Sequence, residues 1–261
     1  MHIKTTIKVI GSLCLINFIT GCAVSSKDIR DPYESWNRNV QSFNDTVDKY
    51  ALKPVAEGYN FIMPSFANVA VTNFFNNIDD IGVTINDFLQ LKFEQSGQDG
   101  ARFLVNTVAG VGGFIDVAQE LNLTKHEEDF DQTLGFWGVP SGPYVVLPLL
   151  GPSTARGIGG RIGDAAMNPI TYVGFINNDL ISGINNGFIT GGINVIKVID
   201  LRSDNLVKGN VAAEAAVDRY DFFKNSYYQR RDFLLNDGKT ADDIDVDNLE
   251  IDKNSSPKKT H

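Results

Sequence analysis

The feature that most constrains the fold of this chain is a long apolar stripe between residues 66 and 89. Its members recur at spacings of three and four, which places them on one face of an α-helix; they are Phe66, Ala70, Phe74, Ile78, Ile81, Ile85, Phe88 and Leu89. The opposite face carries polar groups, on Asn68, Thr72, Asn76, Asp79, Asp80 and Asp87. The pattern predicts one long amphipathic helix whose carboxyl-bearing face is turned to solvent.

Helical spacing also predicts helices before and after this segment. Val40, Phe43, Val47 and Tyr50 form a stripe over residues 37–50. Asp31-Pro32 stands just before it, where Asp suits an N-cap and Pro suits the first helical position. A short segment between Pro54 and Pro64 follows. These patterns place the start of the folded body at residue 31.

The later part of the chain has the same helical character. Gly110, Gly112 and Gly113 interrupt the apolar run 101–118 and predict its division into two helical pieces. A last amphipathic helix, ending near Asp237-Gly238, is marked by Ala212, Ala216, Tyr220, Phe223, Tyr227 and Leu234. The fold class that these patterns predict is mostly α, without internal repeats.

The segment 133–163 is rich in glycine and proline, and most of it is predicted to be irregular. Its breakers are Gly135, Gly138, Pro140, Gly142, Pro143, Pro148, Gly151 and Pro152. Only the run from Tyr144 to Leu147 has the composition of a short strand. A long irregular segment within a compact domain usually means either a functional region or a wrong assignment of its structure, and both interpretations stay open.

The most hydrophobic part of the body is Ile170–Ile199. Its uncharged portion, Leu180–Ile196, is marginal in length for a membrane span. Within it, Gly183, Gly187 and Gly191 stand four residues apart, the pattern of close helix contacts in lipid. A soluble core helix with glycines at tight crossings explains the same pattern, so both interpretations stay open.

The N-terminus has the three zones of a bacterial lipoprotein signal peptide. Lys4 and Lys8 form a basic region, and the apolar run 9–19 is too short for a permanent span. Ile19-Thr20-Gly21-Cys22 resembles a lipobox, so Cys22 is predicted to be acylated and to become the mature N-terminus. We expect a signal peptide over 1–21, a tether over 22–30, one domain over 31–238 and a disordered polar tail over 239–261.

The charge balance excludes several partners. The chain has a formal net charge of -9, and the predicted signal peptide removes two lysines and no acid. An acidic body disfavours nucleic acid and electrostatic docking on anionic lipid. With Cys14 in the signal peptide and Cys22 acylated, no thiol remains for a disulfide or a metal site.

The sequence gives little support to an enzyme. The one histidine within the predicted body, His126, lies in the charged stretch 122–131, which we predict to be a solvated loop. Gly110-Val111-Gly112-Gly113 lacks the third glycine of a dinucleotide motif, and no Gly-Lys-Ser/Thr element exists. We therefore expect no catalytic residue, no metal site and no cofactor.

Several separated segments together resemble the MlaA (VacJ) family of lipoproteins. They occur in the same order along 31–238: 31–38 (DPYESWNR), 86–90 (NDFLQ), 102–107 (RFLVNT), 112–118 (GGFIDVA), 132–135 (QTLG), 142–149 (GPYVVLPL), 151–153 (GPS) and 228–233 (YQRRDF). One departure is Arg156-Gly157, where the family usually has Arg followed by Asp. Arg156 is therefore predicted to lack an adjacent acidic partner.

The resemblance implies a lipid-trafficking lipoprotein of the outer membrane. Its body would be a ring of amphipathic helices in the membrane plane, removing mislocalised phospholipid from the outer leaflet through an amphipathic channel. The implied partners are phospholipid, the outer-membrane bilayer, a trimeric porin and a periplasmic carrier. From the segment 133–163 we take as candidate channel or gate residues Trp137, Pro140, Tyr144, Pro148 and Arg156.

Two other functions stay open at this stage. The first is a structural lipoprotein that docks on porins or the cell wall and moves no lipid. The second is a lipid hydrolase, which fatty-acid release by the purified protein would reveal.

Overall fold

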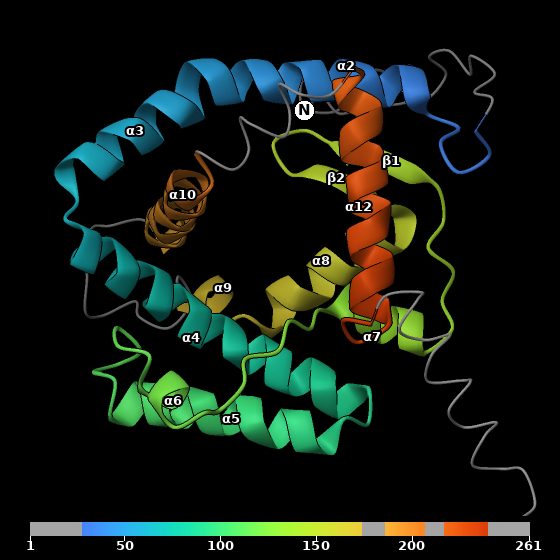
Figure 1. The fold of residues 1–261 in the computed structure, drawn as a ribbon. Helices are drawn as coiled ribbons and strands as arrows, with labels where there is room; N and C mark the ends of the chain where they lie inside the picture. Colours follow the sequence, from blue (N-terminus) through green and yellow to red (C-terminus); the bar gives the residue numbers. More distant parts are fainter. Residues whose placement is uncertain (1–27, 174–185, 207–216, 240–261) are drawn as a thin grey trace, which may run out of the picture.

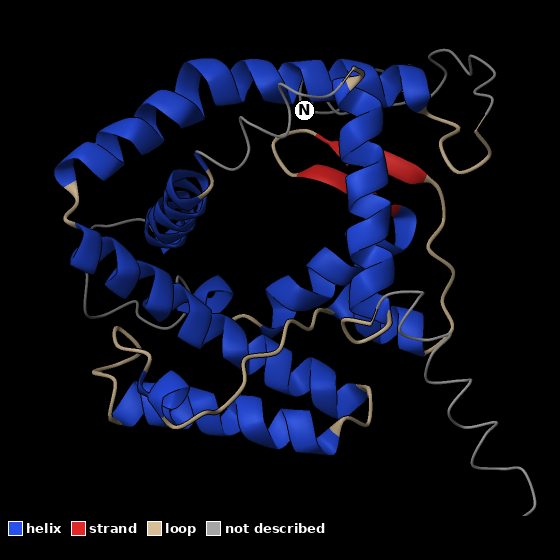
Figure 2. Cartoon of the chain, in the orientation of Figure 1, coloured by secondary structure: helices blue, strands red, loops and turns tan. Residues whose placement is uncertain are grey.

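The computed structural model describes residues 28–173, 186–206 and 217–239 (Figure 1). The predicted signal peptide, the acylation site Cys22, Gly183 and the tail beyond residue 239 lie outside the described residues, as do Ala212 and Ala216 of the last predicted stripe. The described residues are mainly helical, with one two-stranded sheet (Figure 2).

The first helices form one nearly continuous rod. It consists of α2 (Glu34–Val47), the π-helical η1 (Asp48–Leu52) and α3 (Lys53–Ile62), with Pro54 in the first turn of α3. The helix predicted over 37–50 is confirmed, but Asp31 is not its N-cap. Tyr33 takes that position, and the carboxyl of Asp31 is instead fully buried among side chains from distant elements.

The long helix predicted from the apolar stripe is α4 (Ser65–Leu89), and α5 (Phe93–Val108) returns alongside it (Figure 1). Ser96 Oγ donates to Thr84 O at 2.9 Å, and Asn77 Nδ2 donates to Thr107 Oγ1 at 2.9 Å, so polar groups join the pair along its length. The predicted break after 108 is confirmed, and the short α6 (Val117–Glu120) follows it. Gly113 turns the chain there with a φ of 93°.

Regular structure fills much more of the segment 133–163 than its composition suggested. The strand predicted at Tyr144–Leu147 is β1, and it pairs antiparallel with β2 (Gly151–Thr154), with Tyr144 opposite Thr154. Helices α7 (Phe130–Phe136) and α8 (Ala155–Met167) flank this hairpin. Irregular backbone is confined to 137–143 and 148–150.

The glycines of α8 permit close packing and do not break the helix. A Cβ at Gly160 would lie 2.7 Å from the backbone nitrogen of Asp131, and a Cβ at Gly163 would overlap the ring of Phe130. Both contacts are with α7, so α7 and α8 approach more closely than larger side chains would allow. Tertiary contact therefore outweighs the low helix propensity of glycine.

The chain ends with α9 (Ile170–Val173), α10 (Asn186–Asp204) and α12 (Arg219–Leu235). In Figure 1 the α2–α3 rod, α4 and α12 lie along three sides of the molecule, and α10 lies against α3 and α4. Within the described ranges, no helix combines the length and the apolar character that a membrane crossing requires.

Two acids on the polar face of α4 are buried, contrary to the expectation that this face meets solvent. Asp80 and Asp87 on its polar face are 1% and 0% exposed, whereas Phe66 and Phe88 on its apolar face are 79% and 60% exposed. The same inversion recurs over much of the surface, where exposed apolar side chains include Phe61, Ile62, Val69, Leu104, Val108, Leu149, Leu150 and Ile162. Buried polar groups hold the interior together, and apolar groups form much of the outside.

Candidate functional site

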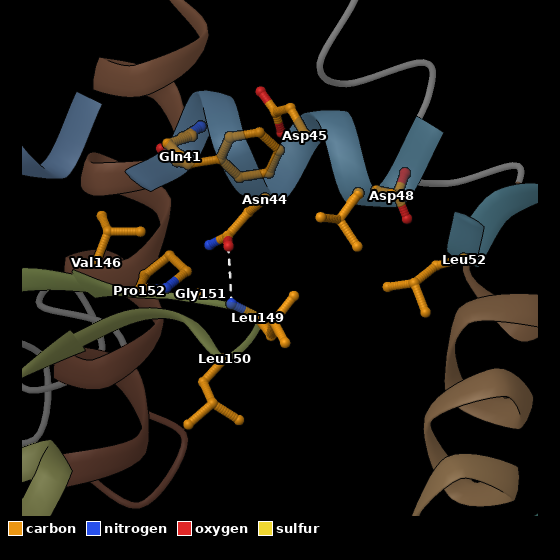
Figure 3. A pocket seen from close by; sticks show the side chains of 12 residues that line it. Gln41, Asn44, Asp45, Asp48, Leu52, Val146, Leu149, Leu150, Gly151 and Pro152 are labelled. Atoms are coloured by element: carbon orange, nitrogen blue, oxygen red, sulfur yellow. Dashed lines mark hydrogen bonds between the residues drawn. The ribbon is translucent and has the colours of Figure 1, made fainter. Parts of the chain in front are cut away.

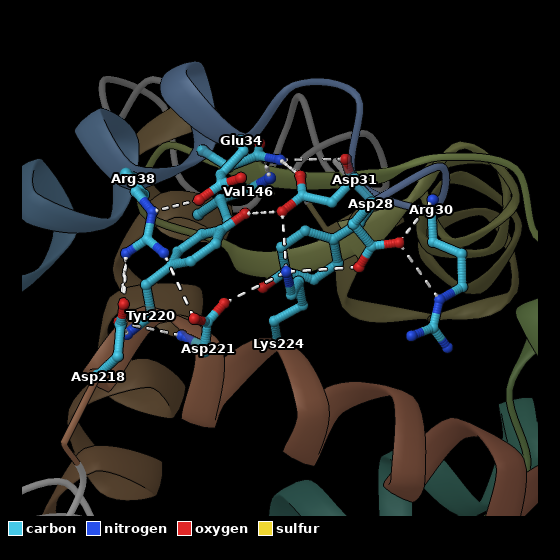
Figure 4. Close-up of polar contacts among 12 residues, drawn as sticks. Asp28, Arg30, Asp31, Glu34, Arg38, Val146, Asp218, Tyr220, Asp221 and Lys224 are labelled. Atoms are coloured by element: carbon cyan, nitrogen blue, oxygen red, sulfur yellow. Dashed lines mark hydrogen bonds and ion pairs between the residues drawn. The ribbon is translucent and has the colours of Figure 1, made fainter. Parts of the chain in front are cut away.

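A buried polar network joins the N-terminal rod, the hairpin and α12 (Figure 4). Asp31 accepts hydrogen bonds from Asn37 Nδ2 at 2.9 Å, from the Tyr220 hydroxyl at 2.6 Å and from Lys224 Nζ at 3.2 Å. Asn37 is itself fully buried; it donates to Tyr144 O and accepts from Val146 N. This network fixes strand β1 against α2 and α12.

A second amide, on α2 two turns beyond Asn37, holds the tip of the hairpin. Asn44 Nδ2 donates to Leu147 O at 3.0 Å, and Leu149 N donates to Asn44 Oδ1 at 2.7 Å. The turn residue Leu149 has a φ of 64°, and its side chain is 65% exposed. The hairpin tip therefore carries an exposed apolar side chain but is fastened to α2 through its backbone.

The hairpin tip and the N-terminal rod enclose a cavity of about 260 Å³, which we call the hairpin pocket (Figure 3). Its lining residues come from α2, η1, the hairpin and α12; they are Gln41, Asn44, Asp45, Val47, Asp48, Leu52, Val146, Leu149, Leu150, Gly151, Pro152 and Phe223. In Figure 3 Asn44 points from α2 toward the hairpin turn, where Leu149 and Leu150 lie. The rod side thus combines four polar side chains with Val47 and Leu52, and the hairpin side is apolar.

The size and lining of the hairpin pocket suit part of a lipid molecule. Pockets that enclose a whole drug-sized ligand measure about 300–1,000 Å³, so this cavity holds a segment of a chain and not a complete lipid. The apolar side chains, together with the amides and the carboxylates of Asp45 and Asp48, match a molecule that has both an apolar and a polar part.

The Asn44 contact leads to a prediction about the mobility of the hairpin. Asn44→Ala removes two hydrogen bonds worth about 0.5–1.5 kcal/mol each, so the amide of Leu149 should exchange its hydrogen about ten- to a hundredfold faster. Hydrogen-exchange mass spectrometry of the peptide that contains the tip measures this. Asn39→Ala, on the same helix, is the matched control, and equal exchange in both variants would show that Asn44 does not hold the tip.

The candidate gate residues lie in different surroundings. Tyr144 is fully buried in the small core that Val40, Val146 and Tyr220 complete, and Pro148 stands beside the hairpin tip. Trp137 is 51% exposed, with its indole Nε1 donating to Leu89 O at 3.2 Å, and Pro140 is exposed in the loop after α7. Tyr144 and Pro148 therefore belong to the hairpin itself, but neither of them lines the hairpin pocket.

Arg156 has no acidic neighbour in the sequence, but it has an acidic partner in the fold. Its Nε donates to Asp131 Oδ1 at 2.7 Å, across the α7–α8 contact. Arg231 of α12 bonds the same carboxyl and also bonds Asp129, at 2.6 and 2.9 Å. Burial raises the pKa of Asp129, but the bonds from Arg231 outweigh it and hold the pKa below the usual value. We call these four residues the arginine–aspartate cluster.

His126 lies in the irregular stretch before α7, whose neighbouring residues Lys125 and Glu127 are exposed as predicted, but its own side chain is partly buried. Its side chain is 20% exposed, and Nδ1 lies 2.7 Å from Asp99 Oδ2, which is fully buried in α5. Asp87 of α4 is also fully buried. Burial, and then the neighbouring charges of Asp99 and Glu128, raise the pKa of Asp87 to about 8. The described residues contain no cluster of histidine, cysteine and carboxylate groups suited to a metal ion.

An exterior rich in exposed apolar side chains, over an interior joined by buried polar groups, defines an α-helical protein built for an apolar interface. Comparison with protein families agrees with this class, because residues 29–234 match the model of the family described as "MlaA lipoprotein". The chain belongs to the MlaA lipoprotein family.

Individual relatives extend over different shares of the chain. It is 32% identical over 246 residues to the "Intermembrane phospholipid transport system lipoprotein MlaA" of Shigella flexneri, covering 92% of this chain and 91% of that protein. The similar protein of Haemophilus influenzae is 31% identical over 238 residues, covering 86% of this chain and 88% of the relative. An uncharacterised protein of Rickettsia felis is 37% identical over 158 residues, and the match spans only 62% of its length.

A solved structure has the same fold. It is described as "Structural basis for maintenance of bacterial outer membrane lipid asymmetry", and it superposes with a TM-score of 0.67 at 32% sequence identity. The match covers 78% of this chain and 98% of the other. The predicted mostly α fold class and the resemblance to the family are thus confirmed.

Proposed function

We propose that this protein removes mislocalised phospholipid from the outer leaflet of a Gram-negative outer membrane and passes it to a periplasmic carrier. The observation that carries the proposal is the inversion of α4, with buried Asp80 and Asp87 and exposed Phe66 and Phe88. Such a helix is stable where lipid covers its apolar face. The names of the Shigella and Haemophilus relatives, which refer to intermembrane phospholipid transport, support the same function.

In this proposal the helices form a ring that lies in the inner leaflet, and the lipid passes on its inner side. The amphipathic hairpin pocket receives part of the lipid, and the hairpin, with Tyr144 buried at its base and Pro148 beside its tip, acts as the gate. Trp137, Pro140 and Arg156 remain candidates for the surrounding wall. Passage of a lipid needs no bond to be broken, so the protein is proposed to be a transporter component and not an enzyme.

We also propose that acyl chains on Cys22 anchor the mature protein after removal of residues 1–21. Each buried methylene of such a chain contributes roughly 0.8 kcal/mol, so two or more chains suffice for stable anchoring. Mass spectrometry of the N-terminal peptide of the mature protein tests this, because that peptide should begin at Cys22 and carry the mass of the attached lipid.

The proposed partners are a trimeric porin beside the ring and a soluble carrier in the periplasm. The alternative is a structural lipoprotein that docks on a porin without moving lipid. Co-purification with a porin supports both, so the test must follow the lipid itself.

Reconstitution separates these functions. The acylated protein is placed in vesicles that contain labelled phospholipid, and the purified carrier is added outside. We expect the carrier to acquire labelled phospholipid many times faster than from vesicles without the protein. Equal rates with and without the protein, in either orientation, would establish the structural alternative, and release of free fatty acid would establish the hydrolase.

A further inference from the structure

Three hydroxyl groups surround Gly157 in the first turn of α8. A methyl group at Gly157 would lie 2.8 Å from Ser153 Oγ, 3.2 Å from the Tyr227 hydroxyl oxygen and 3.3 Å from Thr154 Oγ1. Ser153 and Thr154 are each 1% exposed. Thr154 Oγ1 is occupied as the N-cap acceptor of Gly157 N, whereas Ser153 makes only a long bond of 3.4 Å to a carbonyl. Only glycine leaves this space open, and we call it the hydroxyl cradle.

The hydroxyl cradle opens on a cavity of about 140 Å³ that is lined by Arg161 as well as by Ser153, Gly157 and Tyr227. Arg161 stands four residues after Gly157, so both lie on one face of α8. A cavity of this size holds several waters, since one water needs roughly 10–15 Å³. It is therefore large enough for a phosphate group with its oxygens.

Arg161 differs from the other two arginines near this cavity. Arg156 and Arg231 are bonded to Asp129 and Asp131 in the arginine–aspartate cluster. Arg161 forms no ion pair with a carboxylate among the described residues, and its one bond there is from Nη2 to Pro152 O at 3.1 Å. Most of its N–H donors remain free for an anion.

The remaining acid of the cavity has partners of its own. Asp164 accepts from Phe130 N at 2.8 Å and from Asn86 Nδ2 at 3.4 Å. Burial raises the pKa of Asp164 to about 6, which weakens its competition for the guanidinium of Arg161 near that pH. Arg161 and the hydroxyl donors thus line one cavity, in which Asp129 and Asp131 are already bonded to Arg231 and Arg156.

The hydroxyl cradle and the hairpin pocket lie on opposite faces of strand β2, because successive side chains of a strand point to opposite sides. Gly151 and Pro152 line the hairpin pocket, and the next residue, Ser153, lines the cradle. The apolar part of a ligand bound through Arg161 therefore lies outside the hairpin pocket. Ile162, which follows Arg161 in the sequence, has a side chain that is 68% exposed.

We propose that Arg161, with the hydroxyls of Ser153 and Tyr227, binds the phosphodiester of a glycerophospholipid whose acyl chains lie outside this cavity. The proposal rests on the proposed function, and it names the residues that contact the phosphate of the transported lipid. Guanidinium groups suit phosphate because their planar donors form charge-assisted bonds to its oxygens.

The test measures binding to the complete acylated protein in detergent. The probe is dihexanoylphosphatidylglycerol below its micelle concentration, titrated by calorimetry. Arg161→Gln should weaken binding about tenfold, equivalent to about 1.4 kcal/mol. Arg161→Lys should retain part of the affinity, and Ser153→Ala should weaken binding to a smaller degree. Arg230→Gln, at an exposed ion pair with Glu127, is the matched control and should bind as the unmodified protein does.

Two further probes identify the source of the phosphate. Dihexanoylglycerol, which lacks the phosphate, should bind at least tenfold more weakly, and so should inorganic phosphate, which lacks the apolar part. Equal affinity of the unmodified protein and Arg161→Gln, with unchanged circular dichroism, overturns the proposal. Binding of inorganic phosphate as tight as that of the lipid probe also overturns it and indicates a site for the free anion. The vesicle reconstitution tests the proposed function independently of these binding measurements. If the protein transfers no lipid there, the proposed function is refuted whatever the affinities are.

Discussion

Replacing Arg231 with leucine should lower the free energy of unfolding by about 3–5 kcal/mol, the usual cost of removing one partner from a buried ion pair. Its guanidinium is 16% exposed and bonds both Asp129 and Asp131, of which Asp131 is 6% exposed. Without Arg231, Asp129 loses its bidentate partner, and Asp131 keeps only Arg156. The loss of two charge-assisted contacts should separate α12 from α7.

The preceding residue supplies the control for this experiment. Arg230 pairs with Glu127, but both side chains are more than 60% exposed, and such surface pairs contribute about 0–1 kcal/mol. Urea titrations in detergent, followed by far-ultraviolet circular dichroism, should therefore show a large shift for Arg231→Leu and almost none for Arg230→Leu. Similar midpoints for the two variants would refute the structural role of the arginine–aspartate cluster.

The type of the long helix α4 could be predicted from sequence, but its orientation could not. Periodicity shows that the two faces differ, and it does not show which face meets the surroundings. The prediction turns Asp80 and Asp87 to solvent because water is the usual surroundings of a folded protein. Asp80 lies 3.8 Å from Arg102 of α5, and Asp87 lies beside the carboxyl of Asp99, also of α5, neither of which a pattern within α4 reveals.

The segment 133–163 shows a second limit of sequence interpretation. Its composition predicts strand β1 but not α8, because glycine is usually a helix breaker. Whether a glycine breaks a helix or permits a close contact depends on the surface that faces it, here Asp131 and Phe130 of α7. One signal was available, because Asp129 and Gln132 stand three residues apart, as in an N-terminal capping pattern, and Asp129 does cap α7.

The residues of the candidate site were still harder to predict. The prediction for Arg156 depends on its neighbour at 157, but its partner is Asp131, 25 residues earlier in the chain. Asn44, which holds the hairpin tip, contacts Leu149 across 105 residues. Such pairs are set by the packing of α2, α7 and α8 on the hairpin, and no local pattern encodes them.

Replacing Asp87 with asparagine should flatten the pH dependence of stability at neutral and alkaline pH. The pKa of Asp87 is raised to about 8 in the folded protein from its ordinary value of 3.8, mainly by burial. The folded state therefore holds a proton that the unfolded state releases. The stability associated with this proton is fully present below the unfolded pKa and is lost as pH rises through the folded pKa.

The expected size of this effect follows from the slope for one proton. Each pH unit between the two pKa values removes about 1.4 kcal/mol, so the unmodified protein should lose about 3 kcal/mol between about pH 6 and pH 9 through this group. The asparagine side chain of the variant carries no proton that can be lost, and it stays neutral beside Asp99. The free energy of unfolding of Asp87→Asn, measured relative to that of the unmodified protein, should therefore increase from the acid end to the alkaline end of this range.

Asp79→Asn provides the contrast, because Asp79 is on the same helix but is 37% exposed and paired with Lys197 at 2.7 Å. Loss of that pair should lower stability by a similar small amount at both ends of the range. Urea midpoints at several pH values measure all three proteins. Parallel curves for the unmodified protein and Asp87→Asn would mean that Asp87 is already ionised in the folded state, and that its burial is compensated by a cation.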